Sequence, residues 1–187
     1  MSQFEYLSVL ISIIVGLGVS HLLSSAARLI QARRQVRFYL PTLLWMCFLL
    51  LLQIQVWWVA FERAEQTGWH FFLFVLYLLI PVGAFLLSYL IVPDLDAASG
   101  IDLRASYYQN RSWLYGILTA LVLISLLDEA VENGAIPRDL DALFRVGFLG
   151  MATVGLLSRG PRLHFALSSA LLAGFLGYIL LLFLRLN

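Results

Sequence analysis

Apolar stretches separated by short polar turns dominate the chain. Two of them, 112–127 and 146–158, are short and stop beside charged residues. These two reach the length of a membrane-spanning helix only if the flanking charges enter the outer part of the bilayer. Four others carry no charged residue and reach the roughly 20 apolar residues that such a helix needs: 6–27, 38–61, 69–92 and 163–184.

This pattern predicts an all-α fold, a polytopic membrane helix bundle in which the whole chain, 1–187, forms one domain. A re-entrant hairpin is the alternative for the two shorter stretches. The first stretch has no basic segment before it and is too long for a signal peptide, so we expect it to stay as a helix. The six expected transmembrane helices are 4–30, 38–62, 69–92, 112–132, 141–158 and 162–186.

The composition supports a membrane setting and excludes several classes of function. Hydrophobic residues make up 61% of the chain and charged residues 12%, whereas a soluble domain carries roughly 25% charged residues. The net charge of +1 leaves no basic face for nucleic acid. All 12 basic residues are arginines. No lysine amine can therefore form the Schiff base of a retinal pigment or a pyridoxal enzyme.

The arginines also predict the orientation of the helices. If the six helices alternate in direction, eight arginines share one side, and most acidic residues lie on the other. Because arginine and lysine are in excess in cytoplasmic loops, both termini should be extracytoplasmic. The expected location is the inner membrane of a bacterium, with membrane lipid around the helices. The eight arginines are Arg28, Arg33, Arg34, Arg37, Arg104, Arg111, Arg159 and Arg162.

One connection between helices, 93–111, is long and polar. Its apolar residues suggest a short helix that lies on the membrane surface before the fourth transmembrane helix begins. Tyr107 and Tyr108 fall within it, and together with Trp69 and Trp113 they are expected to be aromatic anchors at the membrane interface.

Charged residues gather where the fourth helix ends and the fifth begins. Asp128, Glu129 and Glu132 close the fourth helix, and Arg145 lies one turn inside the fifth. Asp128 and Arg145 have a similar expected depth, about 6 Å below the interface at 1.5 Å of rise per residue. Because an unpaired charge inside a membrane is costly, we predict that Arg145 pairs with Asp128 or Glu129. The cluster is either a structural clamp or an ion or proton site.

Small residues recur at every fourth position of the first helix. Such a ridge lets a second helix approach closely, which is a main source of helix association in lipid. The fifth and sixth helices carry matching glycines and alanines, so helices one, five and six are predicted to pack together, within one chain or between chains. The alternative is a hydroxyl-lined path. The candidate residues are Glu5, Ser8, Ser12, Gly16, Ser20, His21 and Ser24.

Two glutamines, Gln53 and Gln55, lie in the outer half of the second helix. Two residues correspond to about 200° of rotation around a helix, so the two side chains cannot face the same cavity. One can line a path while the other bonds a neighbouring helix. Gln53 is kept as a candidate with the path or ridge residues of the first helix.

The sequence predicts no catalytic, cofactor-binding or metal-binding residue. His21, His70 and His164 are scattered, with no spacing that suits a metal site on one helix. Three functions remain: an oligomeric channel or transporter for an ion or small solute, a non-transporting membrane subunit or scaffold that binds partner proteins, and, least favoured, an intramembrane enzyme. The expectation is therefore a protein that is not an enzyme, needs no cofactor, and works as a homo-oligomer or as a subunit of a membrane complex.

Overall fold

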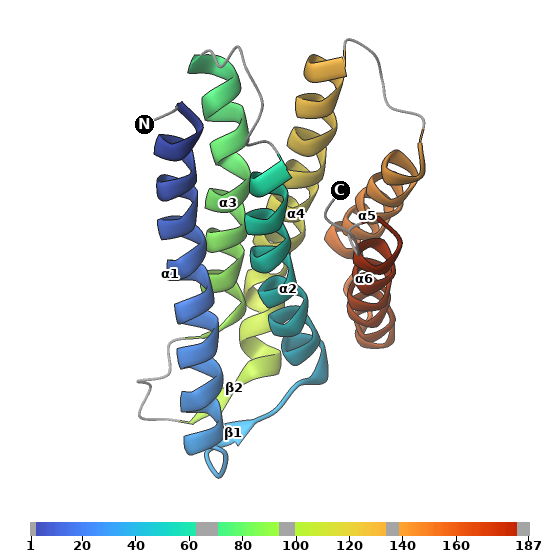
Figure 1. Cartoon of the computed structure of the whole chain (residues 1–187). Coiled ribbons are helices and arrows are strands. Elements are labelled where there is room, and N and C mark those ends of the chain that lie inside the picture. Colours follow the sequence, from blue (N-terminus) through green and yellow to red (C-terminus); the bar gives the residue numbers. More distant parts are fainter. Residues whose placement is uncertain (1–2, 63–70, 94–99, 134–138, 183–187) are drawn as a thin grey trace.

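The computed structural model describes residues 3–62, 71–93, 100–133 and 139–182. Successive helices alternate in direction and form a bundle (Figure 1). Two short parallel strands, β1 and β2, pair Val36 with Ile101. The elements are α1 (Gln3–Gln31), β1 (Val36–Arg37), α2 (Leu40–Glu62), α3 (Phe71–Ile91), β2 (Ile101–Asp102), α4 (Leu103–Asn133), α5 (Leu140–Leu157) and α6 (Pro161–Leu182).

All six helices are long and apolar enough to cross a membrane, which suggests a membrane-integral protein. The expected helices 4–30, 38–62, 69–92 and 141–158 are confirmed to within two residues at each end. The expected helix 162–186 is confirmed as α6 as far as Leu182, and its last residues lie outside the described part of the chain.

The start of α4 differs most from the sequence prediction. The helix begins at Leu103 and includes Tyr107, so the separate surface helix expected within the connection 93–111 is wrong. The side chain of Asp102 explains the earlier start. Its Oδ1 accepts hydrogen bonds from the backbone N–H groups of Arg104, at 2.9 Å, and Ala105, at 3.0 Å, which caps the first turn of the helix.

The two shorter apolar stretches lie in two helices that are each long and apolar enough to span a membrane. α4 has 31 residues and α5 has 18, which correspond to about 46 Å and 27 Å at 1.5 Å per residue. The two helices pack along each other. Asp139 begins α5, because its Oδ1 accepts a hydrogen bond from the backbone N–H of Ala142 at 2.9 Å.

The order of packing around the bundle is α1 on α2 and α3, α3 on α4, α4 on α5, α5 on α6, and α6 on α2. Within one chain, the predicted contact of helix one with helices five and six is therefore wrong. The packing of α1 is explained by Gly18, a glycine of α1 that is not part of the ridge of small residues. Gly18 is buried and faces the side chain of Gln53, with no room for a Cβ. α1 thus approaches α2 closely through Gly18 instead of through its ridge of small residues.

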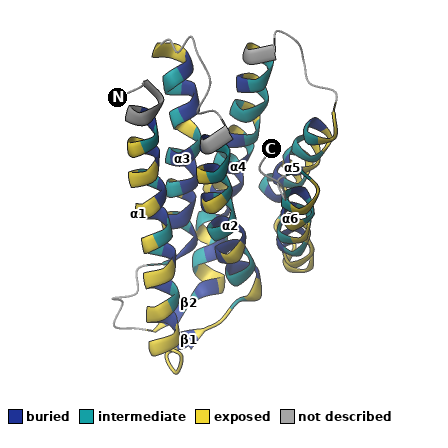
Figure 2. Cartoon of the chain, in the orientation of Figure 1, coloured by how far each residue is buried: buried dark blue, intermediate teal, exposed yellow. Residues whose placement is uncertain are grey.

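The buried residues lie between the helices (Figure 2), and many large apolar side chains are exposed on the outward faces. Trp45, Leu49, Leu87, Tyr107 and Tyr115 are at most 1% exposed. An exterior of large apolar side chains would be costly in water, whereas lipid tails cover it without that cost. Examples of exposed apolar residues are Val9 at 54%, Ile13 at 55%, Leu17 at 55%, Leu143 at 67% and Leu181 at 66%.

Candidate functional site

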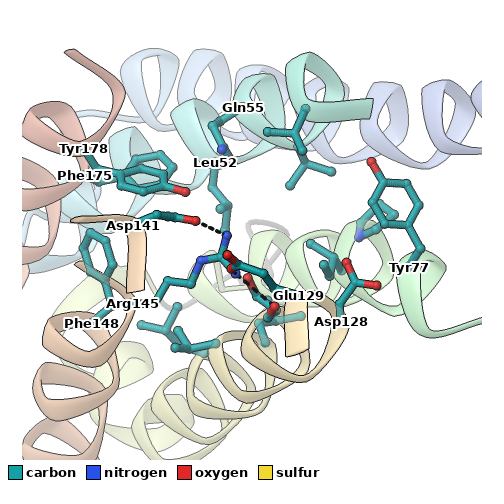
Figure 3. A pocket seen from close by; sticks show the side chains of 18 of the residues that line it. Leu52, Gln55, Tyr77, Asp128, Glu129, Asp141, Arg145, Phe148, Phe175 and Tyr178 are labelled. Atoms are coloured by element: carbon teal, nitrogen blue, oxygen red, sulfur yellow. Dashed lines mark hydrogen bonds and ion pairs between the residues drawn. The ribbon is translucent and has the colours of Figure 1, made fainter. Parts of the chain in front are cut away.

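A cavity of about 410 Å³ lies between the helices, and all six helices contribute to its wall. Most of the wall is apolar, including the rings of Phe48, Phe148 and Phe175. Figure 3 shows charged side chains from the end of α4 and the start of α5 pointing into this space. The polar residues of the wall, apart from two tyrosines, are Gln55, Ser125, Asp128, Glu129, Asp141 and Arg145.

Arg145 of α5 holds the charged part of the cavity together. Its Nη1 lies 2.5 Å from Oε2 of Glu129 and donates to the backbone carbonyl of Ser125 at 3.0 Å, both on α4. Its Nη2 pairs with the carboxylate of Asp141, one turn earlier in α5. The predicted pair with Glu129 is confirmed. Asp141 was missed, although its spacing of four residues from Arg145 was visible in the sequence.

Asp128, Glu129, Asp141 and Arg145 together form what we call the cavity cluster. The Arg145, Glu129 and Asp141 side chains are 18%, 15% and 19% exposed, and Asp128 is 3% exposed. Consecutive residues point about 100° apart around a helix, so Asp128 cannot share the direction of Glu129 toward Arg145. In Figure 3, Asp128 lies on the Tyr77 side of the cavity, away from Asp141.

As expected, one glutamine of α2 bonds a neighbouring helix and the other faces the cavity. Gln53, which was the candidate for the path, is the one that bonds the neighbouring helix. Its side chain is fully buried, and its Nε2 donates to Oγ of Ser88 on α3 at 3.2 Å. Gln55 lines the cavity instead. Gln53 is therefore a link between α2 and α3, and Gln55 is the glutamine that a bound solute would meet.

The small-residue ridge of α1 faces away from the cavity. Ser12, Gly16, Ser20 and Ser24 are exposed, whereas Ser8 is half-buried. α1 contributes only Ile11 to the cavity wall. The hydroxyl-lined path is therefore not found among the described residues of α1.

The other candidates of α1 and α4 have different surroundings. The ring of His21 stacks on that of Tyr89, with the centroids 3.8 Å apart. Ser12 accepts a hydrogen bond at its Oγ from the indole nitrogen of Trp57 at 3.3 Å. The side chains of Glu5 and Glu132 lie outside the described part of the chain. None of the described contacts joins His21 to the cavity.

A second buried arginine lies at the other end of the α4–α5 pair. Arg111 is 7% exposed, and its Nη1 donates to the backbone carbonyls of Gly155 at 3.0 Å, Leu156 at 2.9 Å and Ser158. These carbonyls end α5, where the helix leaves acceptors without partners and carries partial negative charge. Arg111 thus ties the first turns of α4 to the end of α5. The sequence had indicated only a cytoplasmic loop charge.

Next to Arg111, three side chains form what we call the tyrosine–histidine network: Tyr107, Tyr115 and His164. The Tyr107 hydroxyl lies 2.9 Å from that of Tyr115 and 3.0 Å from Nδ1 of His164. Nε2 of His164 lies 3.0 Å from the Ser158 carbonyl. Since a carbonyl only accepts, Nε2 carries the hydrogen, and Nδ1 of the neutral ring accepts from Tyr107. Tyr107 is fully buried, so its predicted role as a surface anchor is wrong.

The two strands make a polar edge beside this network. Arg37 of β1 and Asp102 of β2 form an ion pair at 3.3 Å. Hydrogen bonds from the backbone of Ala105 and Arg104, with Arg37 nearby, hold the pKa of Asp102 below its usual value. Burial raises the pKa of Tyr39, and its hydrogen bond to the hydroxyl of Tyr108 raises it further. This edge fastens the α1–α2 connection to the start of α4.

The cavity offers charge and ring faces to a ligand. Among the residues described, no three histidine, cysteine or acidic side chains are arranged to hold a metal ion. Carboxylates attract a cation, and the faces of Phe148, Phe175 and Tyr178 add cation–π attraction where a positive group lies over them. The arrangement therefore suits an organic cation better than a chelated metal ion.

Comparison with known proteins does not extend this description. No protein-family model matches the sequence, no curated protein matches it, and no solved structure matches its fold. The six apolar helices and the cavity between them are thus the features on which a function can be argued.

Proposed function

We propose that this chain is a multi-pass membrane protein that transports a small cationic solute, which binds in the cavity between the six helices. In this proposal the membrane is the bacterial inner membrane. The ends of the helices that carry most of the arginines lie in the cytoplasm, because basic residues favour that side. Both termini and the cavity cluster then lie toward the extracytoplasmic side.

The excess of carboxylates in the cavity carries the proposal. Asp128, Glu129 and Asp141 contribute three negative charges when ionised, and Arg145 contributes one positive charge, which leaves an excess of two. Charge in helices of this apolarity is costly, and charged side chains there usually face a water-filled cavity or a functional pathway. A cationic solute bound beside the carboxylates lowers that cost.

The apolar wall favours a solute with an apolar body. Ligand sites of about 300–1,000 Å³ with mostly hydrophobic walls and a few fixed polar groups are typical for small molecules, and this cavity has about 410 Å³. Gln55 and Tyr77 add neutral polar groups to the wall. The solute class that combines these features is a small organic cation.

Uptake by liposomes tests the proposal. Purified protein is reconstituted into vesicles that contain DNA, and entry of ethidium, an aromatic cation, is followed by its fluorescence. We expect uptake above that of protein-free vesicles. We also expect a loss of about tenfold for Asp128→Asn, because removal of one buried carboxylate weakens the attraction for the cation.

Thr153→Val is the matched control for the uptake experiment. Thr153 is an exposed residue of α5, and its hydroxyl donates only to the carbonyl of Leu149 in its own helix, at 2.8 Å. This variant should transport as the unaltered protein does. Equal rates for protein-containing and protein-free vesicles across several organic cations would contradict transport.

A second candidate function is a non-transporting subunit or scaffold, and the exposed glycines favour it. A Cβ added at Gly16, Gly147, Gly150 or Gly177 would meet no atom within 4 Å. Small residues on an outward helix face allow another helix to approach closely in lipid, and that helix can belong to a second copy or to another protein. Native mass spectrometry in mild detergent, repeated with Gly16→Leu, tests this association. A stable assembly without solute flux would favour the subunit role over transport.

A further inference from the structure

A hollow of about 480 Å³ lies where α1 ends and the chain turns toward β1. It is open to the surroundings and contains no acidic side chain in its wall. Three exposed guanidinium groups, those of Arg28, Arg33 and Arg34, surround it, and Gln31 and Gln35 add two amides. Five side chains with N–H donors therefore surround one small space.

The backbone of this turn is already hydrogen-bonded within itself. The N–H of Ala32 donates to the carbonyl of Arg28 at 2.9 Å, and the N–H of Gln35 donates to the carbonyl of Ala32 at 2.8 Å. Nη1 of Arg33 donates to the carbonyl of Ile30 at 3.3 Å. An anion in the hollow would therefore be bound by side chains. A guanidinium has five N–H groups, so Arg33 keeps most of its donors for that role.

Some arginines of the described chain form ion pairs with carboxylates, but Arg33 and Arg34 do not. Arg37 pairs with Asp102, and Arg145 pairs with Glu129 and Asp141. Within the described ranges, neither Arg33 nor Arg34 forms an ion pair. Two adjacent positive charges repel one another unless an anion lies between them. Phosphate suits this position, because arginine binds its oxygens in a two-pronged manner.

An apolar strip runs along α1 from the hollow. Leu23 is 54% exposed and Ile30 is 63% exposed, and Ala27 between them is also exposed. Residues at spacings of four and three lie on the same face of a helix. If α1 spans the membrane, the hollow at its end near Gln31 lies at the depth of the lipid head groups. If the phosphate of a lipid binds in the hollow, the acyl chain of that lipid would thus lie along this strip.

We propose that the hollow binds the phosphate of an anionic membrane lipid, whose acyl chain covers the Leu23–Ile30 strip of α1. The proposal rests on the membrane location given under the proposed function, and it is independent of transport. A soluble phosphate compound would use the same guanidinium groups but not the apolar strip. The experiment must therefore separate the two sources of phosphate.

Lipid binding to the purified protein tests the proposal. The protein in mild detergent is titrated with phosphatidylglycerol or with phosphatidylcholine of the same acyl chains, and bound lipids are counted by native mass spectrometry. We expect phosphatidylglycerol to bind about tenfold more tightly, because its head group carries a net negative charge that basic residues attract, whereas the head group of phosphatidylcholine has no net charge. The double variant Arg33→Gln/Arg34→Gln should remove that preference.

Arg159→Gln/Arg162→Gln is the matched control. These two arginines are also exposed, Arg159 between α5 and α6 and Arg162 in the first turn of α6, at the same end of the bundle. The control should keep the preference for the anionic lipid. Equal loss in both double variants, or no preference in the unaltered protein, would overturn a specific site. If the Arg33/Arg34 double variant does not fold, Arg34→Gln alone should weaken phosphatidylglycerol binding several-fold.

Competition with inorganic phosphate separates the two sources. We expect phosphate at high concentration to displace phosphatidylglycerol only weakly, because it makes no contact with the apolar strip. Displacement at micromolar phosphate would overturn the lipid and identify a site for soluble phosphate. Since no flux is measured, failure of transport in liposomes leaves this result unaffected, and failure of lipid binding leaves the transport proposal standing.

Discussion

The buried Arg111 and the partly buried Arg145 join α4 to α5, one at each end of the pair, and they are neutralised in different ways. Arg111 donates to three backbone carbonyls at the end of α5. Arg145 pairs mainly with the carboxylates of Glu129 and Asp141, beside a cavity of about 410 Å³. Backbone carbonyls carry no net charge, whereas carboxylates do and bind cations. The first arginine therefore suits a fixed joint, and the second suits a site that binds a charged ligand.

The packing of side chains around Arg111 also differs from that around Arg145. Beside Arg111, the rings of Tyr107, Tyr115 and His164 fill the space, and each of the three is fully buried. Beside Arg145, the cavity remains. A buried polar network in which each member has a partner gives rigidity, while a cavity leaves room for a ligand or for movement. We infer that α5 is held firmly at the Arg111 end and less firmly at the Arg145 end.

Replacement of Arg111 should have the largest effect on stability. In Arg111→Met, the buried carbonyl of Gly155 and the partly buried carbonyls of Leu156 and Ser158 lose a charged donor, and that of Ser158 keeps its contact with Nε2 of His164. Unmade buried hydrogen bonds cost about 1–3 kcal/mol each, so we expect unfolding in detergent to be easier by about 4 kcal/mol. Arg104→Met, at an exposed position of the same helix, is the control. Similar stabilities of the two variants would contradict the proposal that Arg111 holds α4 and α5 together.

Replacement of Arg145 should have a smaller effect that a second substitution partly reverses. Arg145→Leu leaves the partly buried carboxylates of Glu129 and Asp141 without their counter-charge, which costs about 3 kcal/mol. Because these carboxylates are 15% and 19% exposed, water screens them in part, and the loss should be smaller than for Arg111→Met. The double variant Arg145→Leu/Glu129→Gln should regain part of the stability in the same unfolding assay. A double variant less stable than the single variant would show that Glu129 is not the main partner of Arg145.

The hydroxyl of Tyr107 gives a more limited test of rigidity at the Arg111 end. Tyr107→Phe removes the hydrogen bonds to Tyr115 and His164 and keeps the ring, so we expect a loss of about 1–2 kcal/mol. Gln55→Met at the cavity wall serves for comparison and should cost less, because the ligand-sized space beside the Gln55 amide can hold water. Thermal unfolding of both variants in the same detergent measures the difference. The reverse order would contradict the contrast between the two ends.

The smallest effect should come from Asp102, an exposed carboxylate at the Arg111 end. Its pKa is lower in the folded chain than the ordinary value of 3.8. Its contribution to stability is therefore complete above that ordinary value and is lost as the pH falls through the lowered pKa. Unfolding of the protein and of Asp102→Asn should converge as the pH is lowered through this range. A difference that stays constant with pH would exclude the carboxylate as its cause.

The helices followed closely from the apolar pattern, because length and apolarity are local properties of the sequence. α4 was the exception. Its first turns contain Arg104 and Arg111, which resemble a polar connection when neighbours are unknown. The burial of Arg111 against α5 depends on residues far along the chain. The cap by Asp102 is local, since it bonds residues two and three positions later, and an aspartate at this position is a helix-start signal that the sequence prediction missed.

The candidate site was also only partly predictable, because some of its features are local in the sequence and others depend on distant segments. Costly charge inside an apolar segment indicated that Arg145 needs a partner, and the choice between Glu129 and Asp128 required the directions of the side chains around α4. The tyrosine–histidine network brings Tyr107, Tyr115 and His164 together from α4 and α6. No spacing along the chain indicates that contact.

The sequence by itself determined six apolar helices, their approximate limits and the need to neutralise Arg145, because each follows from the cost of exposing or burying a local segment. Only the tertiary structure decided which helix faces pack, that Gln55 and not Gln53 lines the cavity, and that the ridge of α1 points outward. These choices depend on the fit of side chains between distant segments, as at Gly18 and Gln53. Such fit is a property of the assembled bundle.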